Sequence, residues 1–304
     1  MPRLYKKPSL VVLARHLLSI FSDYFLMVSH DVIVRFAPKI QNSPVFGSSP
    51  RKVHFFYCTC GNDFKYLILS LKSLELLRLD CIGNIYIYVD KKNPFTFNQV
   101  KELKGSFPFS MEIKMTRRPL SWGGVKLLLV ELAAFEEINL NIAADDYIFK
   151  VDSDVLFISD RIFKKVIAEN HEAFGQAKPK PDDFMEGGSY FLKSTLVTRI
   201  VRSPIRKAII YASSSWGCSI DQAPEDRAIS KLAQENGVKL MLCEYRLGGR
   251  DMWRLIKNEA IKSYSIIHCS PHAGVKKETM IDIWKLLALR KRMQADSGIK
   301  RSLS

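Results

Sequence analysis

Residues 145–160 read DDYIFKVDSDVLFISD, and this stretch decides how the rest of the chain is interpreted. Its apolar part, 147–151, is short and rich in β-branched and aromatic residues, which predicts a buried strand. Asp152 and Asp154 follow at a spacing of two, ahead of a second apolar run over 155–158. Buried carboxylates are costly unless a partner neutralises them, and a divalent cation is the usual partner. We therefore expect a metal site here, the alternative being a polar turn that ends a strand.

Apolar runs and helical periodicities alternate along the chain on both sides of this stretch. Further strands are expected at 52–59, 84–89, 111–115, 173–177, 238–243 and 264–269, and helices at 64–74, 97–104, 124–138, 195–211, 224–236 and 280–293. Such alternation predicts an α/β fold with a parallel, doubly wound sheet and ligands at the carboxyl ends of its strands. Asp90, Asp152 and Asp154 all fall at such ends.

The 304 residues carry a net charge of +15 that is concentrated at the two ends of the chain. Residues 1–52 hold eight Lys/Arg against two Asp, and residues 276–304 hold eight against three acidic residues. We expect a basic N-terminal extension over 1–50, a central domain over 51–275 and a basic helical tail over 276–304. Basic flanks suit an anionic membrane surface, an anionic substrate or nucleic acid. The six cysteines lack metal-type spacing, which favours buried thiols and leaves a disulfide open.

Residues 9–28 predict an amphipathic helix. Arg15 and Asp23 would each cost about 2.5–3.5 kcal/mol near the centre of a membrane span, so a transmembrane helix is not expected. No small-residue cleavage site follows, so a signal peptide is not expected either. A helix at a membrane interface and a helix packed on the domain's own surface both remain open.

Three further features follow the carboxylates in the sequence. Gly187 and Gly188 precede an expected strand and allow close backbone approach to a bound group. Glu225 and Asp226 open a helix, where the helix dipole alone also favours acidic residues, and His268 ends a late strand. No Gly-rich loop follows the first strand, which argues against a dinucleotide or Walker-type phosphate site. A diphosphate ligand would need a metal here, and two carboxylates with an imidazole suit Mn²⁺ (or Mg²⁺).

Four segments in this order resemble the GT-A glycosyltransferases, whose nucleotide-sugar-dependent fold carries an Asp-x-Asp motif. They are FKVDSDVLF (149–157), EGGSYFLKS (186–194), PEDRAISKLAQENGV (224–238) and SIIHCSPHAGVKK (265–277). The resemblance covers residues 52–275, and the Gly-Gly segment is similar to that of the inverting β-1,3-galactosyltransferase and fringe-like branches. It implies a GT-A (Rossmann-like), mostly parallel twisted sheet flanked by helices, with helical N- and C-terminal extensions.

The resemblance also implies roles for individual residues. Asp154 would bind the metal directly, Asp152 would reach the metal or the ribose, and His268 would be the third ligand. Asp226 would act as the catalytic base, with Glu225 as the alternate. The remaining implied donor contacts are Thr59, Asp90, Ser153, Gly187, Gly188 and Lys276. For His268 the alternative is a core histidine, and for Asp90 it is an ordinary turn residue.

We therefore expect a metal-dependent glycosyltransferase that moves a sugar from a UDP-sugar to a hydroxyl of a glycan or lipid-linked saccharide, with inversion. An Asp221-Gln222 pair occurs in some retaining enzymes, so retention stays open. The residues also leave open a two-metal nucleotidyltransferase and a basic nucleic-acid- or membrane-binding protein. No nucleic acid partner is expected, because the central domain is nearly neutral. We expect a cytoplasmic protein in peripheral contact with an anionic membrane, or else the Golgi lumen through a weak N-terminal anchor.

Overall fold

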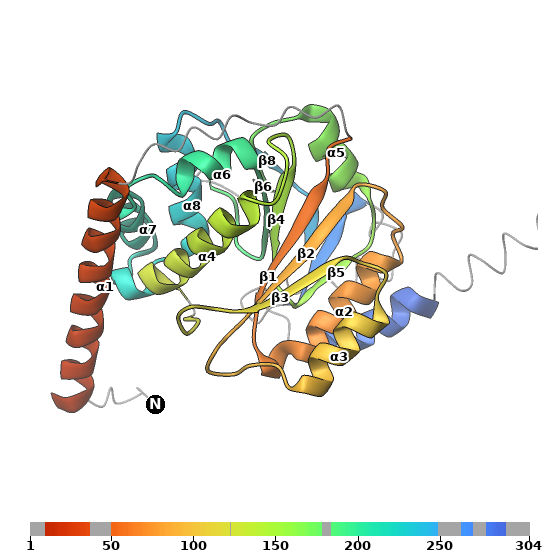
Figure 1. Ribbon diagram of the computed structural model, residues 1–304, viewed down its shortest axis with the longest axis horizontal. Helices are drawn as coiled ribbons and strands as arrows, with labels where there is room; N and C mark the ends of the chain where they lie inside the picture. The colour runs from red at the N-terminus through yellow and green to blue at the C-terminus, as the bar shows by residue number, and fades with distance from the viewer. Residues whose placement is uncertain are drawn as a thin grey trace, which may run out of the picture.

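The computed structural model describes residues 10–36, 50–121, 123–177, 184–248, 263–269 and 278–289. Within them a twisted seven-stranded sheet lies between two layers of helices (Figure 1), in the order β3-β2-β1-β4-β7-β6-β8. Every neighbouring pair is parallel except those made by β7, which runs antiparallel to β4 and β6. The strands are β1 (Val53–Thr59), β2 (Ile82–Val89), β3 (Met111–Met115), β4 (Tyr147–Val151), β6 (Ala173–Gln176), β7 (Ser189–Lys193) and β8 (Met241–Cys243). The expected α/β, mostly parallel sheet flanked by helices is confirmed.

Alternating side chains of the central strands build a separate core on each face of the sheet. Phe56 and Ile148 point into one core, and Phe55 and Phe149 point into the other. The first core is covered by α4 (Gly124–Asn139), α6 (Ser194–Ile200), α7 (Arg206–Trp216) and α8 (Glu225–Glu235). The second is covered by α2 (Phe64–Glu75), α3 (Phe97–Ser106) and α5 (Arg161–Glu169). Short 3-10 turns, η1 (Gly61–Asp63) and η2 (Ile220–Gln222), lie in the connections.

A second, three-stranded sheet contains β5 (Val155–Phe157), β9 (Arg246–Leu247) and β10 (Ile266–His268). β10 pairs antiparallel with β5, in a register that sets His268 opposite Val155. The amide of Cys269 extends this pairing by donating to the carbonyl of Asp154 over 2.9 Å. The small sheet therefore brings the end of β10 to the Asp-x-Asp segment. Helical residues 279–289 pack on its outer side.

Helix α1 (Leu10–Phe36) is longer than the predicted 9–28 helix and packs on α4 and α7 (Figure 1). Asp23 forms an ion pair with Lys126 of α4 at 2.8 Å, and Asp31 accepts a 2.6 Å hydrogen bond from the amide of Ile205. By length and composition alone, its part over Leu17–Phe36 qualifies as the one candidate membrane span in the described chain. Whether the extension is a separate unit over 1–50 stays a prediction.

The single helix predicted at 195–211 is wrong. The chain forms α6 and α7 instead, with a break between Ile200 and Arg206. Pro204 lies in the break and cannot donate a backbone hydrogen bond to a continuous helix. The amide of Ile205, just before α7, instead donates a hydrogen bond to the carboxylate of Asp31 in α1.

Candidate active site

Asp152, Asp154 and His268 converge at the carboxyl end of β4. Their ligand atoms all lie within 4.8 Å of one another. Nε2 of His268 lies 3.2 Å from Oδ1 of Asp154 and 3.6 Å from Oδ2 of Asp152. Asp154 and His268 are buried, whereas the side chain of Asp152 is 37% exposed. The group is therefore enclosed on one side and open through Asp152.

The residues of this group fit a divalent cation. Nε2 of His268 is buried and makes no hydrogen bond within the described residues, although it faces two carboxylates. Buried ring nitrogens normally have a hydrogen-bond partner or a metal. Two carboxylate oxygens and one imidazole suit Mn²⁺ or Mg²⁺ and leave coordination positions for phosphate oxygens. The metal-free alternative is an ion pair of protonated His268 with the two carboxylates.

The turn at Gly187 and Gly188 contacts this group and Asp226 at the same time. The carbonyl of Gly188 accepts a 2.9 Å hydrogen bond from the amide of Asp152, and the amide of Gly187 donates to Oδ2 of Asp226 over 2.5 Å. A Cβ added to Gly188 would lie 2.5 Å from Cε1 of His268, and its φ is +94°. Only glycine avoids both the clash and the strain.

Asp226 is a buried carboxyl in the first turn of α8. Burial, aided by the charge of Glu225, raises its pKa to about 7, against hydrogen bonds from the amides of Arg227 and Gly187 that act in the opposite direction. A helix N-terminus by itself favours the ionised form of a carboxyl. The raised pKa therefore departs from an ordinary helix-start residue and matches the requirement for a general base at neutral pH.

Lys150, which sequence reasoning missed, connects the two halves of the site. It lies inside β4 with a side chain only 4% exposed, and its Nζ is 2.8 Å from Asp152, 3.6 Å from Glu225 and 3.9 Å from Glu131. Burial opposes its charge, but these carboxylates raise the pKa of Lys150 well above its usual value. Partial burial disfavours the charged form of Asp152 and by itself would raise its pKa. Lys150 and His268 outweigh this effect and lower the pKa to about 2. Burial raises the pKa of Glu131, which accepts a hydrogen bond from Tyr190.

Arg246 is a second charged residue that sequence reasoning missed. Its side chain is 7% exposed, forms a 2.5 Å ion pair with Glu186 and donates a hydrogen bond to the carbonyl of Gly187. It therefore fixes the glycine turn from the side of β9. A lone arginine between polar residues gives no signal of this contact in the sequence.

The remaining predicted donor residues are less closely joined to this centre. Thr59 ends β1, and its buried Oγ1 has no hydrogen bond within the described residues. Asp90 uses Oδ1 to accept hydrogen bonds from the amides of Lys92 and Leu120, so its described contacts are those of a turn residue. Ser153 is buried between the two aspartates, and Lys276 lies outside the described residues.

Replacing Lys150 by methionine should destabilise the fold by about 3 kcal/mol, because breaking a buried ion pair leaves carboxylates without compensation. The loss should lie at the low end of the expected range, because burial raises the pKa of Glu131 to about 8 and this carboxyl already holds a proton at pH 7. Urea unfolding at pH 7 measures the loss, and the second substitution Glu225→Gln should recover part of it, because it removes a carboxylate that faces Lys150 at 3.6 Å. Lys164→Met, at an exposed ion pair with Asp160, is the control and should change stability by less than about 0.5 kcal/mol. Wild-type stability in Lys150→Met would contradict the assigned network.

Gly188→Ala should weaken Mn²⁺ binding by at least about tenfold, because the added Cβ displaces His268, and disturbing the groups that hold a metal ligand in place typically lowers metal affinity by about 10–100-fold. Gly217→Ala is the matched control: its φ is +67°, but nothing lies within 4 Å of the added Cβ. Both variants carry the strain of a positive φ, and only the first displaces His268. Titration followed by the electron paramagnetic resonance of free Mn²⁺ separates them. Equal Mn²⁺ affinity in the two variants would argue against the metal site.

No protein-family model and no curated protein sequence matches this chain. Among solved structures, it is similar to galactosyltransferase LgtC in complex with donor and acceptor sugar analogues, with a TM-score of 0.50 and 12% identity. This match covers 77% of the present chain and 95% of LgtC. Mouse xyloside xylosyltransferase 1, in its apo form, matches with a TM-score of 0.43 and 10% identity, over 72% of the chain and 97% of that protein. The match to LgtC shows that the chain has a glycosyltransferase fold of the GT-A type, as the sequence motifs indicated.

Proposed function

We propose that this protein is a metal-dependent glycosyltransferase that transfers a sugar from a UDP-sugar to an acceptor hydroxyl with inversion. The observation that carries the proposal is the turn at Gly187 and Gly188. It contacts a candidate metal-ligand group on one side and a carboxyl with a pKa near 7 on the other. Both lie at the carboxyl edge of a sheet with GT-A topology, where nucleotide ligands bind in open α/β folds.

The donor half of the site would consist of Asp152, Asp154 and His268. When bound there, Mn²⁺ (or Mg²⁺) neutralises the diphosphate and stabilises the charge that develops on the leaving group. The Thr59 hydroxyl, at the end of β1, and Ser153 would contact the nucleotide, and Lys276 would add a positive charge. The low pKa of Asp152 keeps its carboxylate ionised over the whole physiological range.

Asp226 would act on the acceptor. It would accept the proton of the acceptor hydroxyl while that oxygen bonds to the anomeric carbon and the bond from this carbon to the diphosphate oxygen breaks. The products are the glycoside and the nucleoside diphosphate, and the proton rests on Asp226 until solvent removes it. Glu225 is the weaker candidate, because its carboxylate faces the ammonium of Lys150 at 3.6 Å. A single displacement of this kind inverts the anomeric centre.

Calorimetric titration with nucleoside diphosphates tests the donor half. UDP should bind in the presence of Mn²⁺, and binding should fall at least tenfold when Mn²⁺ is removed by a chelator or in Asp154→Ala, because the diphosphate then loses its counter-charge. Asp282→Ala, at an exposed surface carboxylate, should bind like the wild type. Binding that is indifferent to metal and to Asp154 would sink the proposal.

The pH dependence of turnover tests the base. A general base works only when deprotonated, so kcat should rise with pH, level off above about 7 and fall on the acid side. Asp226→Asn should lower kcat by about 10²–10⁴-fold while UDP affinity stays within a few-fold, and Glu225→Gln should lower it less. A flat profile from acid to alkaline pH, together with full activity in Asp226→Asn, would exclude this assignment. Proton NMR of the product gives the anomeric configuration, and retention would favour the alternative retaining mechanism.

The acceptor is proposed to be a glycan or a lipid-linked saccharide. A cytoplasmic enzyme in peripheral contact with an anionic membrane is the setting that the basic ends of the chain support, with the Golgi lumen as the alternative. A two-metal nucleotidyltransferase would release pyrophosphate, whereas a glycosyltransferase releases a nucleoside diphosphate. Product analysis therefore separates these two classes.

A further inference from the structure

Helix α1 has the polarity of its faces reversed relative to a helix on a water-soluble domain. Its innermost positions, buried against α4 and α7, are Asp23, Met27 and Asp31. Its outward side carries large apolar side chains, which are Leu17, Leu18, Phe21, Phe25, Ile33 and Phe36, and all of them except Leu17 are 68% exposed or more. A helix on a soluble domain normally turns its apolar side inward and its charges outward. The outward side is therefore an apolar surface that needs cover.

Both acidic residues of this helix are satisfied by the protein. Asp23 pairs with Lys126, and Asp31 holds the amide of Ile205. The cost of placing the charge of Asp23 in lipid therefore does not arise, because this side chain faces the protein and is paired with Lys126. In the part over Leu17–Phe36, the charged residue that remains exposed is Arg35.

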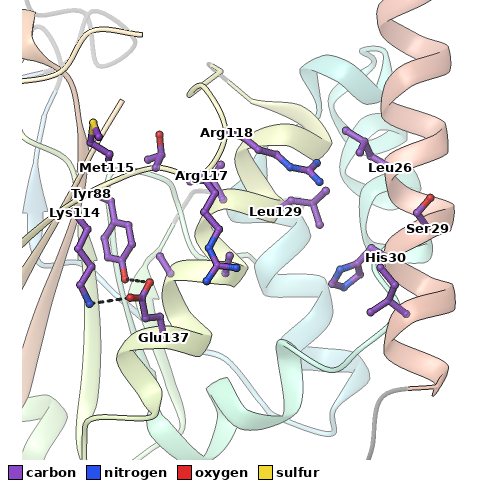
Figure 2. Close-up of a pocket in the computed structure, with 15 residues that line it drawn as sticks. Leu26, Ser29, His30, Tyr88, Lys114, Met115, Arg117, Arg118, Leu129 and Glu137 are labelled. Atoms are coloured by element: carbon purple, nitrogen blue, oxygen red, sulfur yellow. Dashed lines mark hydrogen bonds and ion pairs between the residues drawn. The ribbon is translucent and has the colours of Figure 1, made fainter. Parts of the chain in front are cut away.

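A cavity of about 380 Å³ lies between α1, the end of β3 and α4. Figure 2 shows His30 and Leu26 entering it from α1, and Arg117 and Arg118 entering it from the chain that follows β3. Neither guanidinium forms an ion pair within the described residues, and both arginines are exposed. Glu137 in the same cavity is already hydrogen-bonded by Lys114 and Tyr88. The cavity thus joins apolar walls to three cations, Lys114, Arg117 and Arg118, and to one carboxylate, Glu137, whose pKa is lowered mainly by its hydrogen bond with Lys114 and also by the charge of Arg117.

We propose that this cavity and the outward side of α1 together bind an anionic phospholipid in a bilayer surface. The lipid phosphate would lie between Arg117 and Arg118, where fork-shaped guanidinium groups suit phosphate oxygens. The acyl chains would cover Leu18, Phe21 and Phe25. A protein partner is a poorer occupant, because an apolar interface would bury the two guanidinium groups with Glu137 as the single carboxylate of the cavity lining to balance them, and Glu137 already pairs with Lys114.

The arrangement fits a helix that lies in the membrane interface, and it does not fit one that crosses the bilayer. α1 packs side by side with α4 and α7, so immersing it would carry the polar surface of the domain into hydrocarbon. The lipid site rests on the membrane contact proposed above and assigns it to a surface. It shares no residue with the metal-ligand group or with Asp226, so flotation tests it independently of glycosyl transfer.

Vesicle flotation with the full chain tests the proposal. The wild type should float with phosphatidylcholine vesicles that contain phosphatidylglycerol, and floating should fall as salt is added. The double variant Arg117→Gln/Arg118→Gln should bind these vesicles at least tenfold more weakly, because each cation near an anionic surface contributes substantially to binding. Phe21→Ser/Phe25→Ser should abolish flotation. Lys164→Gln and Phe97→Ser, at an exposed lysine and an exposed phenylalanine elsewhere, are the controls and should float like the wild type.

Four outcomes would overturn the proposal. Equal flotation with pure phosphatidylcholine vesicles, or unchanged flotation of the arginine variant, would exclude the proposed contact of Arg117 and Arg118 with an anionic lipid phosphate. Saturable binding of glycerol phosphate without vesicles would assign the cavity to a free phosphate compound. A dimer that Phe21→Ser/Phe25→Ser dissociates, with no flotation of the wild type, would assign the apolar side to a second copy of the chain. Thermal unfolding of each variant verifies that it is folded.

Discussion

The ammonium group of Lys150 is the interaction on which the candidate active site depends. Carboxylates reach it from the end of β4, from α4 and from the first turn of α8, and without a cation they would repel one another in a region with little water. Because Lys150 is fixed in the middle of the sheet, its charge also sets the position of Asp152 relative to Glu225. Strand β4 therefore positions the charged residues of the site relative to one another.

Neutral and ionised carboxyls coexist in this small volume because their surroundings differ. Asp152 faces Lys150 and His268 and stays ionised, whereas Asp226 is buried beside the like charge of Glu225 and holds its proton up to about pH 7. Pairs of titratable groups with pKa values moved apart are typical of acid–base sites. The glycine turn maintains this difference, because it holds Asp226 on one side and Asp152 on the other without a side chain of its own.

The sequence predicted those parts of the molecule that depend on neighbouring residues. Strand β4 and its two aspartates were predictable, because the apolar run and the carboxylates are contiguous. Lys150 was not, since its meaning comes from Glu131 and Glu225, which are distant in the sequence. The break between α6 and α7 was missed because helical periodicity continues through Pro204. The inward side of α1 was equally hidden, because contacts with α4 and α7 decide it.

The pairing of β10 with β5 has a consequence for how the protein matures. His268 must pair across from Val155 before the third ligand of the candidate metal group exists, and more than a hundred residues separate the two. Contacts between such distant segments form late, because closing the intervening chain costs entropy that local contacts do not require. The nascent chain would complete the large sheet through β8 while it still lacked this ligand. The candidate metal group would thus be completed only at the last stage of folding.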